Sequence, residues 1–188
     1  MGQYWKVVSL SRKEWVDPHK LGCGLKLWEQ LANHPGTGAA LIVLCAAMPE
    51  QRGSGDLDLD GQEEPLVKDL KEAAGVVTYA QIAKRTIGRW AGDRIALVGD
   101  YAERGDLRPR DKADLIYHLC ASDEDRLKQV AWLKKLAEEG GNQGYKDKAN
   151  RLAKAQLYKD ISEDVCAVIE HELQGKFSGE GWREFERR

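Results

Sequence analysis

The clearest chemical spacing in the chain lies in a short acidic segment, Asp56-Leu57-Asp58-Leu59-Asp60-Gly61. Three carboxylates at alternate positions followed by glycine match the opening of an EF-hand calcium loop, where hard oxygen ligands surround a hard cation. The twelfth position of such a loop should hold a bidentate Glu, but here it is Val67. The segment therefore predicts one of two things: a solvated acidic loop, or an irregular site for Ca²⁺ or Mg²⁺ on Asp56, Asp58 and Asp60.

A second candidate site flanks an apolar run at residues 95–98. Trp90-Ala91-Gly92-Asp93-Arg94 precedes this run, and Gly99-Asp100-Tyr101 follows it. A buried strand with an Asp at each end can place a carboxylate in a cleft, as metal-dependent hydrolases do. In the alternative, the two Asp side chains bond to their own backbone in Asx turns. The binding candidates are Asp100 and Tyr101 first, then Trp90 as a wall, with Asp93 and Arg94.

Cysteine and histidine come close in sequence three times, as His19 with Cys23, His118 with Cys120, and Cys166 with His171. A cysteine nucleophile needs a thiolate paired with an imidazole, so a cysteine-dependent enzyme stays open as an alternative. Cysteines on apolar helix faces more often act as small hydrophobes. The chain has no zinc-finger spacing, dinucleotide fingerprint or Walker A sequence. Apart from the divalent cation, we expect no cofactor.

Composition and charge set the class of protein. The chain has 188 residues, 42% of them hydrophobic and 32% charged, which predicts one globular domain over residues 1–188. A net charge of −2 makes nucleic-acid binding unlikely, because such binders need surplus Lys and Arg to displace counterions. The basic residues between positions 84 and 112 are interleaved with acidic ones, which largely cancel their field.

Cellular location is predicted from what the N-terminus and the cysteines lack. The first residues contain no apolar signal core, and the longest apolar run, residues 39–48, is too short to cross a bilayer. The four cysteines are far apart and form no CxxC pair. We therefore expect a soluble cytoplasmic protein with no membrane association and no disulfides.

The elements expected to position these residues begin with a β-hairpin, residues 4–10 and 14–16, joined by a polar turn. Helices are predicted over residues 21–32, 39–48, 66–74 and 79–87. Residues 49–65 form an acidic, glycine-rich loop, and residues 95–98 a buried central strand.

The C-terminal half is predicted to be helical. Pro109 opens a helix to about residue 120, and Ser122 with Asp125 caps another that ends at Gly140-Gly141. Further helices follow over residues 146–156 and from Ser162 to a stop at Gly175. Strands do not alternate regularly with helices, so the fold class is α+β: a small, largely antiparallel sheet, from the hairpin and the central strand, covered by helices.

Several motifs of the first half belong together. They are Met1-Gly2-Gln3-Tyr4-Trp5-Lys6, then Pro18-His19-Lys20-Leu21-Gly22 with Gly24-Leu25-Lys26-Leu27, and Trp90-Ala91-Gly92-Asp93-Arg94-Ile95 with Val98-Gly99-Asp100-Tyr101. Together they resemble a family of small uncharacterised microbial proteins with no known activity. The resemblance implies a natural stand-alone module and assigns no catalytic residue.

The function expected first is that of a non-enzymatic binding or regulatory module acting through a protein surface. No complete catalytic constellation stands in the sequence, and Trp182 in the C-terminal tail could dock as an aromatic anchor on a protein partner. The first alternative is a divalent-metal-dependent hydrolase or phosphate-handling enzyme that uses the clustered Asp residues. The second is a cysteine-dependent enzyme.

Overall fold

A computed structural model describes residues 3–32, 36–47 and 78–177. Its single sheet has the strand order β3-β1-β2-β4. The hairpin strands β1 (Trp5–Ser9) and β2 (Glu14–Val16) pair antiparallel, and β3 (Ile95–Gly99) pairs antiparallel with the other edge of β1. The two-residue strand β4 (Lys159–Asp160) lies parallel to β2. The α+β class, the N-terminal hairpin and the helical C-terminal half are confirmed.

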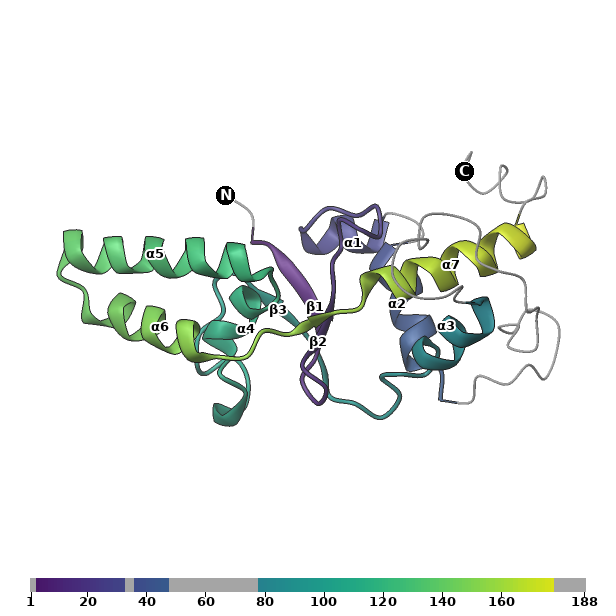
Figure 1. Cartoon of the computed structure of the whole chain (residues 1–188), viewed down its shortest axis with the longest axis horizontal. Helices are drawn as coiled ribbons and strands as arrows, with labels where there is room; N and C mark the ends of the chain where they lie inside the picture. Colours follow the sequence, from purple (N-terminus) through teal and green to yellow (C-terminus); the bar gives the residue numbers. More distant parts are fainter. Residues whose placement is uncertain (1–2, 33–35, 48–77, 178–188) are drawn as a thin grey trace.

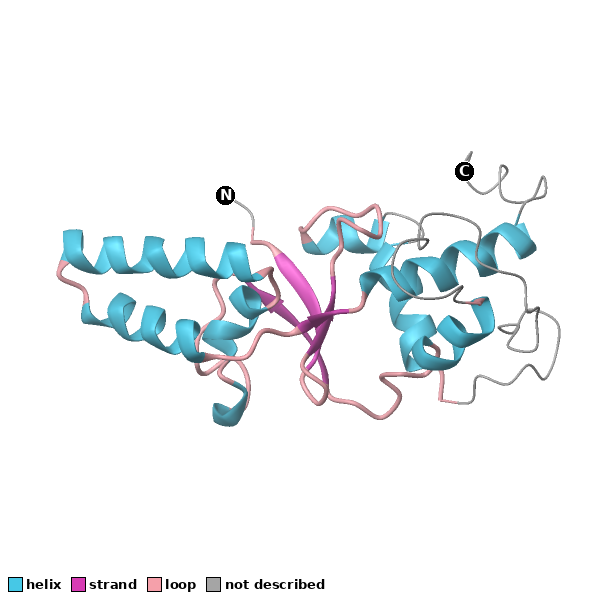
Figure 2. Cartoon of the chain, viewed as in Figure 1, coloured by secondary structure: helices cyan, strands magenta, loops and turns pink. Residues whose placement is uncertain are grey.

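Two groups of helices lie at opposite ends of this sheet (Figure 1). One group consists of α1 (Leu27–Ala32), α2 (Gly36–Cys45), α3 (Tyr79–Thr86) and α7 (Ser162–Phe177). The other consists of α4 (Ala113–Leu119), α5 (Asp123–Gly140) and α6 (Gln143–Lys154), with α5 and α6 forming an antiparallel hairpin. Figure 2 shows the strands crossing between the two groups. The sheet is therefore the element that joins them.

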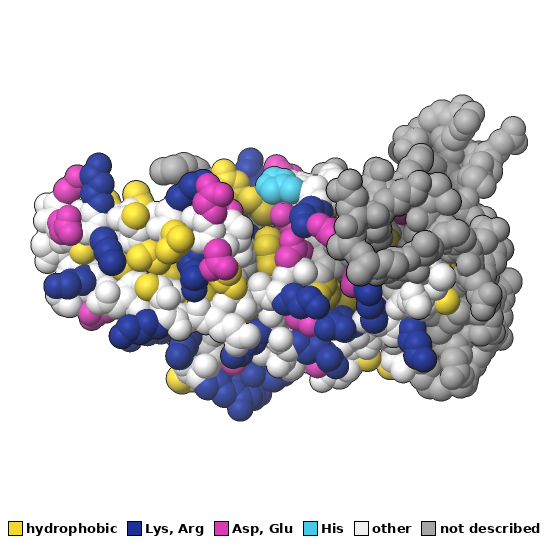
Figure 3. Space-filling view, viewed as in Figure 1, with side chains coloured by type: hydrophobic (Ala, Val, Ile, Leu, Met, Phe, Trp, Pro, Cys, Tyr) yellow, Lys and Arg dark blue, Asp and Glu magenta, His cyan; other side chains and the backbone are white. Residues whose placement is uncertain are grey.

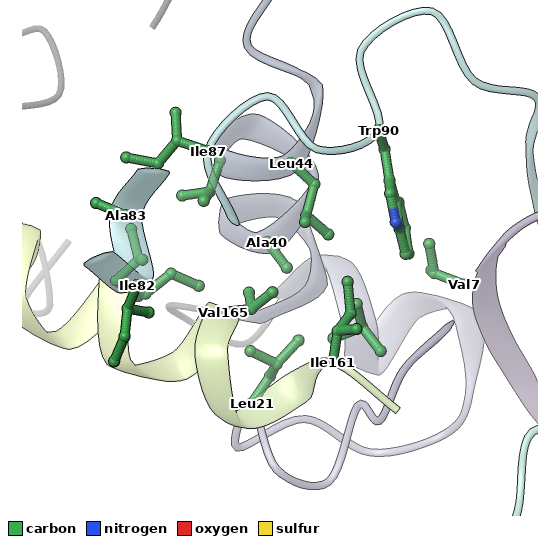
Figure 4. Packing of buried hydrophobic residues seen from close by; sticks show 14 of the residues in the cluster. Val7, Leu21, Ala40, Leu44, Ile82, Ala83, Ile87, Trp90, Ile161 and Val165 are labelled. Atoms are coloured by element: carbon green, nitrogen blue, oxygen red, sulfur yellow. The ribbon is translucent and has the colours of Figure 1, made fainter. Parts of the chain in front are cut away.

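The main hydrophobic core lies at the α2, α3 and α7 end (Figure 4). Leu44 of α2, Ile82 of α3 and Val165 of α7 are fully buried and point toward one another. Trp90 and Val7 extend this cluster to the sheet. Because residues from α2, α3, α7, the loop before β3 and β1 meet here, this core fixes the positions of the three helices relative to β1.

Helix ends follow the predicted signals in the C-terminal half. The Ser122 hydroxyl accepts a 3.1 Å hydrogen bond from the Asp125 N–H, and α5 ends before Gly141 with its φ at 61°. Only glycine adopts that left-handed conformation without strain, so the glycine pair ends the helix as predicted. At α3, Thr78 and Gln81 form a reciprocal capping box.

Several helix boundaries were predicted wrongly. α2 spans Gly36–Cys45 where residues 39–48 were expected, and α6 spans Gln143–Lys154 where residues 146–156 were expected. The helix expected over residues 21–32 begins only at Leu27, because Gly22 adopts a positive φ of 74° and residues 17–23 form tight turns instead. The helix expected from Pro109 is interrupted: Pro109–Asp111 is a single 3-10 turn, and Lys112, with a φ of 53°, separates it from α4. Gly175 does not end α7, which continues to Phe177.

The central strand is confirmed, but its predicted interior position is only partly correct. β3 occupies an edge of the sheet, with β1 as its one strand neighbour. Val98 is buried, whereas the Leu97 side chain is 40% exposed. An edge strand of this length buries one face and leaves the other open to solvent. The predicted helix over residues 66–74 and the acidic loop over 49–65 lie outside the described residues.

Within the described ranges, no helix combines the length and apolar character that a membrane crossing requires.

Candidate functional site

The start of β3 is a structural network. Trp90 is completely buried, and its indole N–H donates a 3.1 Å hydrogen bond to Glu14 Oε2. Arg89 donates a second bond to the same oxygen at 2.7 Å and pairs with Oε1 as well. Burial alone would raise the pKa of Glu14, but the hydrogen bonds from Arg89 and Trp90 hold that pKa below its usual value. Trp90 therefore packs in the main core, and it lines neither of the two cavities described below.

Asp93 and Arg94 are also occupied by neighbours. Asp93 accepts hydrogen bonds from the Ser9 hydroxyl at 2.8 Å and from Arg12 Nε at 2.9 Å. Arg94 forms a bidentate pair with Asp111, at 3.1 and 2.5 Å. Each contact joins the strand to a neighbouring loop, so these two charged side chains stabilise the turn before β3.

The end of β3 is different, because Asp100 and Tyr101 line an open groove of 1130 Å³. Asp100 accepts a 3.1 Å hydrogen bond from the Tyr4 N–H, and the Asp100 N–H donates in return to the Tyr4 carbonyl at 3.0 Å. The two bonds hold Asp100 and Tyr4 side by side at the rim. The whole of β3, about 13 Å from Ile95 to Gly99, lies between Asp93 and this end, so the strand keeps Asp93 apart from Asp100 and Tyr101.

Aromatic side chains dominate the groove. Among the described residues, five Trp and Tyr side chains are exposed, and four of them line it: Tyr4, Tyr101, Trp132 and Tyr145. They come from the segment before β1, the loop after β3, α5 and α6. Of the Trp and Tyr residues that the structure describes, only Trp28, on α1, is exposed elsewhere. Figure 3 shows hydrophobic side chains gathered on the visible face of the α5–α6 hairpin, with charges of both signs around them.

A second, smaller pocket of 480 Å³ adjoins the groove along α4. The two cavities share Tyr117, His118 and Gln129 in their walls. The smaller one is also lined by Lys6 and Trp15 from the sheet, and by Ser122 at the start of α5. The shared side chains of α4 and α5 therefore form a wall between the two cavities.

Lys6 fixes the wall between the two cavities. Its ammonium lies 4.6 Å from the ring centre of Trp15 and 4.5 Å from that of Tyr117, within cation–π range. It also donates to the carbonyl of Tyr117 at 3.4 Å and to that of Cys120. A cation at the C-terminal end of a helix is favourable, so Lys6 holds the end of α4 against the sheet. Burial lowers the pKa of Lys6.

The side chains of that wall are uncharged near neutral pH. Burial lowers the pKa of His118 to about 4 and raises the pKa of Tyr117 to about 12. The two rings meet edge to face, with centres 5.7 Å apart. Because neither side chain is ionised at pH 7, the wall between the two cavities offers aromatic surface and neutral hydrogen-bonding groups.

Charges occur at the α6 side of the groove. Asp114 forms a bidentate pair with Arg151 at 2.7 and 2.9 Å, and Arg104 lies 3.6 Å from it. Lys148 also lines the groove but has no hydrogen bond or ion pair with any described residue. Burial lowers the pKa of Lys148, and Asp114 opposes that effect only through space.

Among the described residues, none of the groups that would serve the two enzyme alternatives are brought together. Asp56, Asp58 and Asp60 lie outside the described residues, and the described ranges contain no cluster of three metal-ligating side chains. Burial raises the pKa of the Cys45 and Cys120 thiols, and it raises the pKa of Cys166 to about 11. A raised pKa disfavours the thiolate at each of these cysteines. Over the same ranges, no hydrogen bond joins Cys120 to His118 or Cys166 to His171.

Sequence reasoning did not single out Trp132, Tyr145 and Lys148 as functional residues. A usable signal existed on α5, where Trp132 precedes Leu133, a member of a second, smaller core. The buried residues of this small core are Leu115, Leu119, Val130, Leu133, Ala149 and Leu152. Consecutive helical residues point about 100° apart, so Trp132 had to face away from the core that Leu133 enters. On α6, Tyr145 and Lys148 are three residues apart and share one face.

Comparison of the chain with family models, with curated proteins and with solved structures finds no match. The resemblance of the first half to small microbial proteins therefore stays a prediction.

Proposed function

We propose that this protein is a non-enzymatic binding module that holds a segment of a partner protein in the aromatic groove. The observation that carries the proposal is the convergence of four exposed aromatic side chains from four separate segments on one groove. Tyr and Trp supply large contact area with little loss of side-chain entropy, and they are enriched where proteins bind one another.

The size of the groove supports a protein segment over a small molecule. Pockets for small molecules usually enclose about 300–1,000 Å³ and bury most of the ligand. This groove is open and measures 1130 Å³, and a separate cavity of 480 Å³ lies on the other side of the shared wall. An extended chain can follow an open groove and place successive side chains against successive rings.

The test compares two matched aromatic substitutions. Random peptides displayed on phage are selected against the full chain and then measured by fluorescence anisotropy with Trp132→Ala and Trp28→Ala. Trp132 lies in the groove, while Trp28 is more exposed, at 78%, and lies outside it. We expect Trp132→Ala to weaken the selected peptides about tenfold or more, because buried aromatic anchors dominate binding energy, and Trp28→Ala to leave them unchanged. Equal effects of the two substitutions would contradict the proposal.

A further inference from the structure

The ammonium group of Lys148 is partly shielded from water and has no ion-pair partner among the described residues. The side chain is half-buried in the groove wall on α6, and no carboxylate of a described residue lies within ion-pair distance of its ammonium. A buried charge usually has a partner, because losing hydration is unfavourable unless another charge or a hydrogen bond compensates.

The neighbouring groups cannot supply that partner. Asp114 is held by both oxygens on Arg151, and Arg104 approaches it as well. His118 is neutral at pH 7 and therefore forms no ion pair with Lys148. The N-terminus of α6, close to Asn142 and Tyr145, adds partial positive charge to the same wall. The α6 side of the groove therefore has a local surplus of positive charge.

The carboxylates that line the groove do not neutralise it. Asp100 accepts the Tyr4 N–H at the rim, and Glu103 is exposed on the loop after β3, where water solvates it. Lys148 differs from both because it is partly desolvated and has no hydrogen-bond partner. A bound group of opposite charge would compensate this loss of hydration.

We infer that the segment bound in the groove carries a carboxylate that pairs with Lys148, next to an apolar or aromatic residue that packs on Trp132 and Tyr145. This inference rests on the proposed function and specifies its partner as an acidic–aromatic peptide segment. A single-stranded nucleic acid would also stack on aromatic rings, but the basic side chains that line the groove are Arg104 and Lys148, and Arg104 already pairs with Asp114. Lys148 can pair with one carboxylate, whereas a run of phosphates needs several cations.

The test uses fluorescent peptides of about ten residues, long enough to follow the groove. Three versions share the same Trp, Tyr and Pro positions and carry two Glu, two Gln or two Lys at the remaining variable positions. Anisotropy titrations use the full chain, Lys148→Met, Lys148→Glu and Trp132→Ala. Lys154→Met is the matched control, because Lys154 is exposed on the same helix and outside the groove.

We expect the acidic peptide to bind about tenfold more tightly than the basic one. Lys148→Met should remove this preference while aromatic-dependent binding persists, Lys148→Glu should reverse it, and Lys154→Met should leave it intact. If all three peptides bind equally and Trp132→Ala weakens them, the inference is overturned and the proposed function stands. If no peptide binds, the inference and the proposed function are both overturned. Both are also overturned if Trp132→Ala leaves peptide binding unchanged and instead abolishes binding of an oligothymidylate or the formation of a concentration-dependent dimer.

Discussion

The two ends of the molecule place most of their aromatic residues differently, with the exposed Trp28 on α1 as an exception at the first end. At the α2, α3 and α7 end, Trp90 and Tyr79 are buried inside the main core. At the α4, α5 and α6 end, the buried residues of the small core are all aliphatic, and Trp132 and Tyr145 lie exposed on the same helices. Large exposed aromatic side chains that cluster usually mark an interaction surface. The first end therefore stabilises the fold, and the second presents the groove.

Of the substitutions that test this comparison, Trp90→Ala is expected to change the free energy of unfolding most. Trp90→Ala leaves a cavity in the main core and removes a hydrogen-bond donor from Glu14, so the free energy of unfolding should fall by about 3–5 kcal/mol. Urea denaturation measures the change. Trp28→Ala is the control at an exposed tryptophan; a Trp90→Ala loss no larger than the control's would contradict the assignment of Trp90 to the core.

An intermediate effect is expected from His118 at acidic pH. Its pKa is about 4 in the folded protein and about 6.5 when unfolded, so the unfolded chain binds the proton first. Stability from this group is therefore complete above pH 6.5 and decreases as the pH falls toward 4, by at most about 3 kcal/mol.

Urea unfolding of the wild type and of His118→Gln from pH 7.5 to 4 measures this contribution. Other carboxylates also titrate in this range, so the difference between the two proteins is the informative quantity. We expect the difference to change progressively between pH 6.5 and 4. A constant difference over this range would show that His118 is not buried in the wall between the cavities.

The smallest effect on stability is expected at Trp132. Its side chain is 52% exposed and makes no polar contact with a described residue, so Trp132→Ala should change the free energy of unfolding by less than about 0.5 kcal/mol. The same substitution should weaken peptide binding strongly. A loss of stability as large as that of Trp90→Ala would place Trp132 in the core and remove the contrast between the two ends.

The sequence predicted those parts of the fold that local patterns determine. The hairpin follows from alternating aromatic and β-branched residues, and the limits of α5 follow from Ser122 and Gly141. The edge position of β3 and the short strand β4 depend on long-range pairing, which no local pattern encodes. The helix expected from residue 21 failed because Gly22 favours a turn there.

The site was predicted in part for the same reason. Asp100 and Tyr101 were chosen because they follow an apolar strand, and they do line the groove. Asp93 precedes the same strand, but the length of β3 separates it from them. Trp132, Tyr145 and Lys148 join Tyr101 only after the α5–α6 hairpin folds next to β3, so their contribution required the tertiary structure.

The central claim is that a partner segment binds at the aromatic groove, and amide chemical-shift mapping tests it most directly. A phage-selected peptide is titrated into ¹⁵N-labelled protein. We expect the largest shifts at residues that line the groove, among them Tyr4, Tyr101 and Tyr145, and none around Trp28 on α1. Shifts centred on α1, or spread evenly over both ends of the molecule, would contradict the claim.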